Sequence, residues 1–315
     1  MSSLVETVAF VFALVALGYL SGWSGFLKEE TGAGLSDFAV SVAVPLLLFR
    51  TMADASFADS LPLHLWATYF TAVAVTWVLA QLTIVHVFGR DSRAGVVGGL
   101  SGSFSNLALL GIPFTLGIFG QQGFEVLSLI LSVHLPIMIA ASIVLFSWFG
   151  DKDAPHGLGA VVRDFVANVA TNPLIIGIVA GLLWRAAGVE MPSLMTRLVD
   201  ALADVAAPVA LFAMGLGLRR YGISGNIRPA IAMAAFKLLL MPVLALLMAK
   251  TMGLTGMSAK VVVAAASLPI GVNPYLIATR FGTGQALASN SMSISTALAF
   301  FTTAFWLAVA EWAFG

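Results

Sequence analysis

The sequence predicts an all-α membrane protein with ten transmembrane helices arranged as two inverted five-helix repeats. Its 315 residues are 60% hydrophobic and only 10% charged, whereas soluble domains carry about 25% charged residues. Matching residues recur in the two halves, and two hydrophobic runs are interrupted by proline and glycine at matching positions. These observations exclude an ordinary soluble protein and favour the inverted-repeat plan of secondary transporters.

Hydrophobic runs long enough to cross a bilayer follow one another along the chain. A helix needs about 20 apolar residues to span the hydrocarbon core. On that criterion the predicted spans run near residues 4–23, 35–53, 63–88, 94–119, 124–149, 171–188, 198–218, 229–252, 259–281 and 286–312. The first run is expected to be a retained span and not a signal peptide, because it lacks a preceding basic region and holds Glu6 near its start.

A linker from Gly150 to Asn168 separates two sets of five spans, which predicts a first repeat over residues 1–155 and a second over 156–315. The halves share residues at constant offsets. At 163 residues the pairs are Asp37 with Asp200, Pro45 with Pro208, Phe49 with Phe212 and Gly18 with Gly181, and at 161 they are Pro113 with Pro274, Ser128 with Ser289 and Ser132 with Ser293. An odd number of spans in each repeat requires the second copy to be inverted.

The basic residues of the loops predict that both termini lie outside, because cytoplasmic loops carry an excess of Lys and Arg. With this orientation the nine cytoplasmic residues are Lys28, Arg90, Arg93, Lys152, Arg163, Arg219, Arg220, Arg228 and Arg280. The five outer residues are Arg50, Arg185, Arg197, Lys250 and Lys260. We therefore expect a multi-pass protein of the cell (inner) membrane.

Spans 4 and 9 are predicted to be broken helices. Ser105–Pro113 and Ser267–Pro274 each place proline and glycine inside an apolar run. Proline removes a backbone donor and clashes with the preceding turn, whereas glycine permits unusual backbone angles. The N–H and C=O groups that such a break releases are tolerated at membrane depth only inside the protein or beside water.

If the two breaks cross, their backbone N–H groups and the amides of Asn106 and Asn273 converge on one place. The N-terminal end of a half-helix attracts an anion such as a carboxylate. The residues expected to bind substrate are Asn106, Gly111, Ile112, Pro113, Pro269, Gly271, Val272, Asn273 and Pro274.

Four motifs resemble the auxin efflux carrier family, which includes plant auxin exporters and bacterial carriers of malonate, malate and similar acids. The motifs are NLALLGIP from Asn106 to Pro113, followed by Gly120, AVPLLLF from Ala43 to Phe49, MGLG from Met214 to Gly217, and LPIGVNP from Leu268 to Pro274. The resemblance covers nearly the whole chain, without the long cytoplasmic loop of many plant members.

This resemblance implies a fold like that of the bile acid sodium symporters. Spans 1, 2, 6 and 7 would form a scaffold that makes a homodimer, and spans 3–5 and 8–10 a transport domain that moves against it as an elevator. In the family the substrate carboxylate meets the asparagine of the first broken span, here Asn106. The prolines of the two breaks map to Pro113 and Pro274.

The chain departs from the plant members at two places that concern coupling. Plant proteins carry an acidic residue near the start of span 3, where this chain has Leu65-Trp66-Ala67-Thr68. A glutamine of the plant support site falls on His134, counted from Gly120. The coupling mechanism of the plant proteins is therefore not carried over to this chain.

Lys237 and His134 are the coupling or support candidates, because both lie inside predicted spans. An intramembrane charge is costly and usually functional. Lys237 could pair with the substrate, hold His134 or act as an internal counter-cation, and snorkelling to an interface is the alternative. Histidine changes protonation near neutral pH, which suits proton coupling; a neutral His134 bonded to a backbone carbonyl is the alternative.

Hydroxyl groups on spans 5 and 10 suggest a cation site. Its candidate residues are Ser128, Ser132, Ser289, Asn290 and Ser293. Oxygen ligands suit a hard cation such as Na⁺. Close helix packing by small residues explains the same pattern and is the favoured interpretation.

The leading functional hypothesis is a secondary carrier of small organic anions, either mono- or dicarboxylates. The alternatives are a sodium-coupled symporter of a larger organic anion and, with less support, a channel. We expect no enzyme, catalytic residue, metal site or resident cofactor, because the sequence holds no cysteine, no H-E-x-x-H motif and no P-loop. The sequence leaves coupling open among Na⁺, H⁺ and neither ion, and the balance of 15 basic and 15 acidic residues gives no sign of a nucleic-acid partner.

Overall fold

A computed structural model describes the chain except for residues 1–2, 56–61, 150–162, 164–165, 168 and 219–224. In the described part all the regular elements are helices. An isolated β-bridge, which is not part of a strand, joins Ser105 and Ile270. The all-α prediction is confirmed to this extent. Most of the linker at 150–168, the predicted repeat boundary at 155/156 and two of the cytoplasmic arginines, Arg219 and Arg220, lie outside the described residues.

The chain forms two compact units. Unit 1 comprises Met1–Leu61, Leu107–Ser132 and Ala167–Arg220, and unit 2 comprises Pro62–Asn106, Val133–Val166 and Tyr221–Gly315. Spans 1, 2, 6 and 7 fall in unit 1, and spans 3, 8, 9 and 10 fall in unit 2. The boundaries at Asn106 and Ser132 divide spans 4 and 5 between the units.

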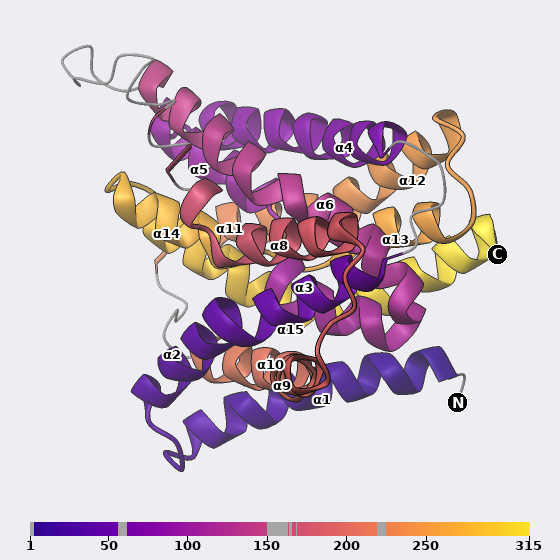
Figure 1. Cartoon of the computed structure of the whole chain (residues 1–315). Helices are drawn as coiled ribbons and strands as arrows, with labels where there is room; N and C mark the ends of the chain where they lie inside the picture. The colour runs from indigo at the N-terminus through magenta and orange to yellow at the C-terminus, as the bar shows by residue number, and fades with distance from the viewer. Residues whose placement is uncertain (1–2, 56–61, 150–162, 164–165, 168, 219–224) are drawn as a thin grey trace. The chain divides into compact units, whose positions relative to one another are not determined.

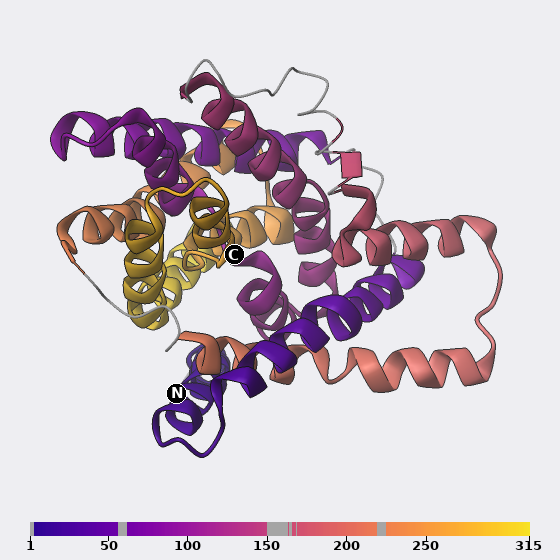
Figure 2. The same cartoon turned by 90° about the vertical axis from the view of Figure 1, so that its left-hand side faces the viewer.

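Unit 1 is built on two helix pairs that pack at glycine. Its elements are α1 (Ser3–Trp23), α2 (Glu29–Phe38), η1 (Ala39–Ala43), α3 (Val44–Asp54), η3 (Leu107–Gly111), the first part of α6 (Ile112–Phe149), α8 (Pro173–Ala187), α9 (Ser193–Ala203) and α10 (Ala206–Gly217). α1 packs along α10, and α3 packs along α8 (Figure 1). Figure 2 shows α8 and α9 joined at the edge of the unit, with α3 between them.

The glycines of these two pairs obey the repeat offset. A Cβ on Gly18 would lie 2.1 Å from the Phe212 carbonyl oxygen, and a Cβ on Gly181 would lie 2.4 Å from that of Phe49. Both the glycines and the phenylalanines are 163 residues apart. Only a residue without a side chain permits this approach, which brings each helix of one half against a helix of the other.

An ion pair connects α3 with the α9–α10 region of unit 1. Nη1 of Arg50 donates to Oδ1 of Asp200 at 3.0 Å and to Oδ1 of Asp204 at 2.8 Å. All three side chains are partly solvent-accessible in the isolated chain. The two acidic residues therefore hold an arginine that lies inside α3, whereas the sequence assigned it to an outer loop.

Unit 2 holds the second broken helix and the helices around it. Its elements are α4 (Leu63–Leu82), η2 (Thr83–Val87), α5 (Ser92–Ser103), the second part of α6, α11 (Arg228–Ala235), η5 (Phe236–Leu240), α12 (Met241–Thr251), α13 (Gly256–Ser267), α14 (Asn273–Arg280) and α15 (Gln285–Phe314). Within it, α4 packs on α5 and α12, and α15 packs on α13, α11 and α5 (Figure 1). The Asp91 side chain caps α5 by accepting the Ala94 N–H at 2.8 Å, as an N-cap aspartate does.

Three π-helical turns occur just before prolines inside helices. The pairs are η1 with Pro45, η3 with Pro113 and η5 with Pro242, and in each the proline follows the turn by two residues. Proline lacks an N–H and clashes with the carbonyl four residues earlier, and a π turn widens the helix there. At η5 the carbonyl that Pro242 leaves without a donor, that of Leu238, instead accepts the indole N–H of Trp306 at 2.8 Å.

Seven helical segments are long and apolar enough to cross a membrane. They are Glu6–Trp23, Glu30–Asp54, Leu63–Val87, Leu107–Phe149, Ser193–Gly217, Arg228–Thr251 and Gln285–Phe314, and two shorter apolar helices are Pro173–Ala187 and Gly256–Ser267. The fourth segment has 43 residues, roughly twice the length that one crossing needs. Gly120, with φ 63° and ψ −158°, interrupts it. The count of ten spans stays a prediction.

Candidate functional site

The two breaks meet in unit 2 as a short antiparallel crossing. Ser105 and Ile270 lie opposite each other. The Asn106 N–H donates to the Pro269 carbonyl at 2.9 Å, and the Gly271 N–H donates to the Phe104 carbonyl at 3.2 Å. These two N–H groups were expected to be open to a ligand. That expectation is wrong, because the crossing itself uses them.

The crossing has its own internal symmetry, which differs from that of the prolines. Its hydrogen bonds relate Asn106 to Gly271, an offset of 165 residues. Pro113 and Pro274, each the second residue of its helix, keep the offset of 161. The segment that leads from the crossing to the proline is therefore four residues longer in the first half of the chain than in the second. Asn106 therefore faces a glycine at the related position, and the expected convergence with the amide of Asn273 does not follow from the repeat.

The first break is shorter than the sequence predicts. Only Phe104, Ser105 and Asn106 are outside helices, because the π turn η3 starts at Leu107 and leads directly into α6. Gly111, Ile112 and Pro113 were predicted to be unwound. Instead they are helical, since the π turn absorbs the proline, and they belong to unit 1. They follow the crossing along the chain.

The second break is unwound from Leu268 to Val272, and its backbone is held by side chains of unit 2. The Ile270 N–H donates to the Ser295 hydroxyl at 3.1 Å. A Cβ added to Gly271 would lie 3.4 Å from the Asn106 Cα, so the two backbones are close. Asn273 and Pro274 then open α14, where Pro274 has no N–H and the N–H groups of Tyr275 and Leu276 donate to the Val272 carbonyl at 3.0 and 3.1 Å.

His134 lies beside the first break in an aromatic enclosure. Its ring centre is 4.8 Å from Phe104, 5.6 Å from Tyr69 and 6.3 Å from Phe70. The side chain is 1% exposed, and within the described part of the chain neither ring nitrogen makes a hydrogen bond of good geometry. Tyr69 donates its hydroxyl proton to the Ser105 hydroxyl at 3.1 Å, which links this enclosure to the crossing.

Lys237 lies at the other break. The π turn η5 places it fully buried, with Nζ 2.6 Å from the carbonyl oxygen of Ala266 at the end of α13. The snorkelling alternative is wrong, because the ammonium group lies inside unit 2 and is bonded there. Lys237 and His134 form no hydrogen bond with each other.

The serines of the predicted cation site are divided between the two units. Ser128 and Ser132 are in unit 1, where their hydroxyls donate to the Phe124 and Leu129 carbonyls of their own helix at 2.8 Å. Ser289, Asn290 and Ser293 are in unit 2, on α15. A sodium site formed by all five residues stays a prediction.

Sequence reasoning missed Ser295, Thr303 and Tyr69. Ser295 holds the second break, Thr303 donates to the Ser267 carbonyl at 3.4 Å, and Tyr69 holds Ser105. The sequence did hold a signal for Ser295. It lies 161 residues after His134, and the same offset separates Pro113 from Pro274. The others have no such signal, since their partners are distant in sequence.

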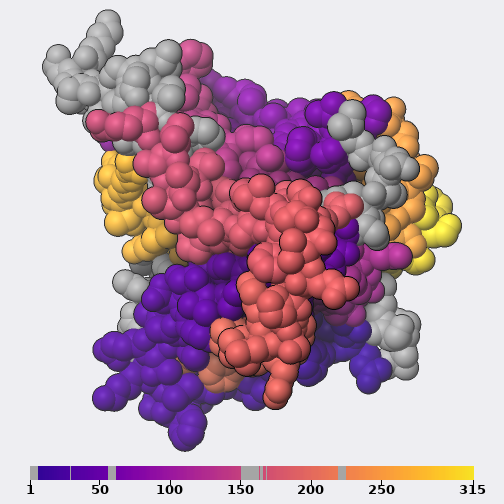
Figure 3. Space-filling view, in the orientation of Figure 1, coloured from indigo at the N-terminus to yellow at the C-terminus, as the bar shows by residue number. Residues whose placement is uncertain are grey.

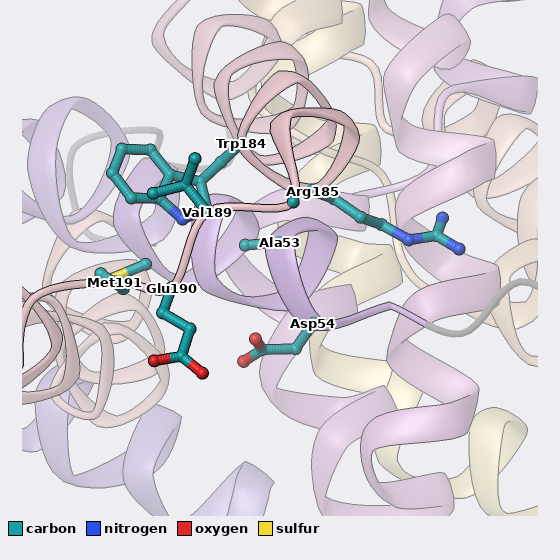
Figure 4. A pocket seen from close by; sticks show the side chains of 8 residues that line it. Ala53, Asp54, Trp184, Arg185, Val189, Glu190 and Met191 are labelled. Carbon is teal, nitrogen blue, oxygen red and sulfur yellow. The ribbon is translucent and has the colours of Figure 1, made fainter.

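Unit 1 contains a separate pocket of about 220 Å³ between the ends of α3 and α8. In Figure 4 the carboxylates of Asp54 and Glu190 lie on the same side, and the guanidinium of Arg185 points away from them. The chain that leaves α8 toward α9 lies on the surface here and covers part of α3 (Figure 3). None of the residues expected to bind substrate lines this pocket.

Comparison with known proteins connects this geometry with transport. The family described as "Membrane transport protein" matches residues 3–156 and 159–307. The chain is 28% identical over 315 residues to the "Putative malonate transporter" of Rhizobium meliloti, covering 95% of this chain and 93% of that protein. It is 24% identical to an uncharacterized transporter of Methanocaldococcus jannaschii, covering 96% and 97%. It is 23% identical to auxin efflux carrier component 8 of Arabidopsis thaliana, covering 93% of both.

Proposed function

We propose that this protein, which belongs to the membrane transport protein family, carries small organic anions across the membrane. Its sequence is also similar to that of an auxin efflux carrier, the family that its motifs resemble. The chain is a multi-pass membrane transporter and not an enzyme. The proposed substrates are mono- or dicarboxylates such as malonate, malate or auxin-like acids. The names of the relatives from Rhizobium meliloti and Arabidopsis thaliana support this class.

The observation that carries the proposal is the crossing of two breaks in unit 2, with Asn106 against Gly271. Broken helices that cross near mid-membrane form the substrate sites of many secondary transporters. The side-chain amide of Asn106 is a hydrogen-bond donor, and the N-terminal end of α14 carries the positive end of a helix dipole, although its Tyr275 and Leu276 N–H groups already donate to Val272. Both suit a carboxylate.

The mechanism that we propose is alternating access by an elevator movement. Spans 1, 2, 6 and 7 would be the scaffold of a homodimer, and spans 3–5 and 8–10 would carry the substrate. The grouping of spans 1, 2, 6 and 7 in unit 1 supports this division. The glycine contacts at the 163-residue offset support the inverted repeat, and both termini would lie outside.

Flux into proteoliposomes tests the function. Purified protein is reconstituted, and saturable uptake of labelled malonate, malate and indole-acetate is measured. We expect uptake of at least one of these acids, with Asn106→Ala lowering it about tenfold or more because a charge-assisted hydrogen bond is lost. Asn226→Ala is the matched control, since Asn226 is exposed in a loop. The absence of saturable uptake of every acid would contradict the proposal.

A sodium-coupled symporter of a larger organic anion is the second candidate. One observation favours it: in the described part of the chain, the buried hydroxyls of Ser293 and Thr296 on α15 have no hydrogen-bond partner. Hydroxyl oxygens of this kind could coordinate Na⁺. Replacement of sodium by choline in the same flux assay separates the candidates, because a symporter would lose its uptake.

A further inference from the structure

Lys237 is a buried lysine whose position is fixed by the fold. It is 0% exposed, although lysine is almost never fully buried unless it is paired. The π turn η5, which accommodates Pro242, directs its side chain toward α13. Nζ and the Ala266 oxygen are 2.6 Å apart, as short as hydrogen bonds assisted by charge.

The ammonium group completes the carbonyl end of the half-helix α13. The last four carbonyls of a helix have no intrahelical donor. In α13, side-chain donors bind three of these carbonyls. The Ser267 hydroxyl donates to the Ala264 carbonyl at 2.8 Å, Lys237 donates to that of Ala266, and Thr303 donates to that of Ser267. This end carries the negative part of the helix dipole, which favours a cation.

The observed hydrogen bond of this ammonium group goes to a backbone carbonyl, that of Ala266, and not to a carboxylate. Within the described residues Lys237 forms no ion pair, whereas Arg50 pairs with Asp200 and Asp204, and Lys260 pairs with Glu311. A buried ammonium without a counter-charge is costly and tends to lose its proton, so a bound anion would stabilise the charged form of Lys237. The crossing follows this helix end closely in the sequence, because Ala266 lies four residues before Ile270, the residue opposite Ser105.

We propose that Lys237 is a built-in counter-cation that takes the place of a coupling sodium ion. In transporters with broken helices, Na⁺ is coordinated by unwound carbonyls and the C-terminal ends of half-helices. Here the lysine ammonium occupies such an end. It neutralises the charge of one substrate carboxylate, so that the carrier binds an organic anion without sodium. This inference rests on the proposed transport of organic anions.

The first test uses the unmodified protein. Uptake of labelled malonate into proteoliposomes is measured in sodium and in choline media at equal ionic strength. We expect the same apparent affinity in both media, within about twofold. A loss of uptake in choline overturns the inference, even though it leaves anion transport intact. The absence of uptake in both media contradicts the proposed function instead.

The second test removes the charge. Lys237→Met keeps the length of the side chain, and we expect malonate binding to weaken about tenfold to a hundredfold, the range given by Coulomb attraction at partly screened distances. Trp306→Phe is the matched control, because it removes a buried hydrogen bond to the same π turn without removing a charge. A folded Lys237→Met protein that binds malonate as the wild type does overturns the inference.

Chemical rescue distinguishes the charge from the packing. In Lys237→Ala, n-propylammonium can supply the missing atoms and the charge, whereas n-propanol supplies nearly the same volume without charge. We expect n-propylammonium alone to restore malonate binding at least about fivefold. Equal restoration by both compounds, or by neither, overturns the inference. If neither variant folds, the sodium comparison on the wild type decides the question.

Discussion

The helix pairs of unit 1 follow the 163-residue offset of the predicted repeat, whereas the crossing in unit 2 departs from it. In unit 1, Gly18 and Gly181 meet the carbonyls of Phe212 and Phe49 at a single offset. In unit 2, the offset changes from 165 residues at the crossing to 161 at the prolines. Asn106 lies against a glycine, and a lysine caps the half-helix of the second break.

This difference distinguishes residues that serve helix packing from residues that we propose to serve substrate binding. Close helix packing requires small residues at both related positions, so the two halves keep them. A small anion has one or two charged groups and no two-fold symmetry that matches the repeat. A site that binds it gains from placing an amide on one break and a cation on the other. The asymmetry is therefore located where we propose that substrate binds.

The symmetry of unit 1 predicts equal damage from two related substitutions. Gly18→Ala and Gly181→Ala each place a Cβ within 2.4 Å of a backbone oxygen, and we expect each to lower the free energy of unfolding by about 2–3 kcal/mol through overpacking. Thermal unfolding in detergent, followed by tryptophan fluorescence, measures the loss. Gly34→Ala is the control, because nothing lies within 4 Å of its added Cβ. Strongly unequal losses would argue against a symmetric pair.

Ser295 is expected to matter more than another buried serine on the same helix. Ser295→Ala leaves the Ile270 N–H without its acceptor, which costs about 1–3 kcal/mol for a buried donor. Ser291→Ala is the matched control, since that hydroxyl donates only to the Leu287 carbonyl of its own helix. Unfolding in detergent and malonate uptake would both be measured. Similar effects of the two variants would show that the contact with the second break has no special role.

The fit of Gly271 against Asn106 predicts a graded response to side-chain size. Gly271→Ala adds a Cβ at 3.4 Å from the Asn106 Cα and should leave uptake within about threefold. Gly271→Val adds two methyl groups in the same direction, and we expect about a tenfold loss of uptake from a steric cost near 1.4 kcal/mol. A Gly271→Val protein with normal uptake would mean that the two backbones separate readily.

The weakest effect is expected at Thr303. Its hydroxyl lies 3.4 Å from the Ser267 oxygen, which is a long hydrogen bond. Thr303→Val keeps the shape of the side chain and should lower the free energy of unfolding by about 0.5 kcal/mol or less. A loss above about 2 kcal/mol in the same unfolding assay would show that Thr303, and not Lys237, is the main donor at the end of α13.

The sequence predicts the second break because proline and glycine act locally, and Pro269 and Gly271 are indeed unwound. The first break was located only approximately, because its unwound residues, Phe104–Asn106, precede Gly111 and Pro113. The predicted extent of the first break was wrong, because residues 107–111 form the π-helical turn η3. A π turn is a small change in hydrogen bonding, which the spacing of apolar residues does not encode.

Partners across long sequence distances were also missed. Lys237 was recognised as unusual, but its acceptor, Ala266, is a backbone carbonyl 29 residues away. Backbone groups carry no residue-specific signal, so the sequence left three roles for the lysine open. Ser295 illustrates the same limit, because a serine is common in membrane helices and only its contact with Ile270 identifies it.

Disulfide formation across the crossing tests the central claim most directly. The chain holds no cysteine, so Ser105→Cys/Ile270→Cys introduces a single pair. Directly opposed residues of an antiparallel bridge have Cα atoms about 4.5–5.5 Å apart, which suits a disulfide. We expect mild oxidation to cross-link most of this variant, as measured by intact mass after thiol labelling, and to leave Ser103→Cys/Ile270→Cys largely reduced. If the first pair stays reduced in folded protein, the two breaks do not meet and the carrier site has no structural basis.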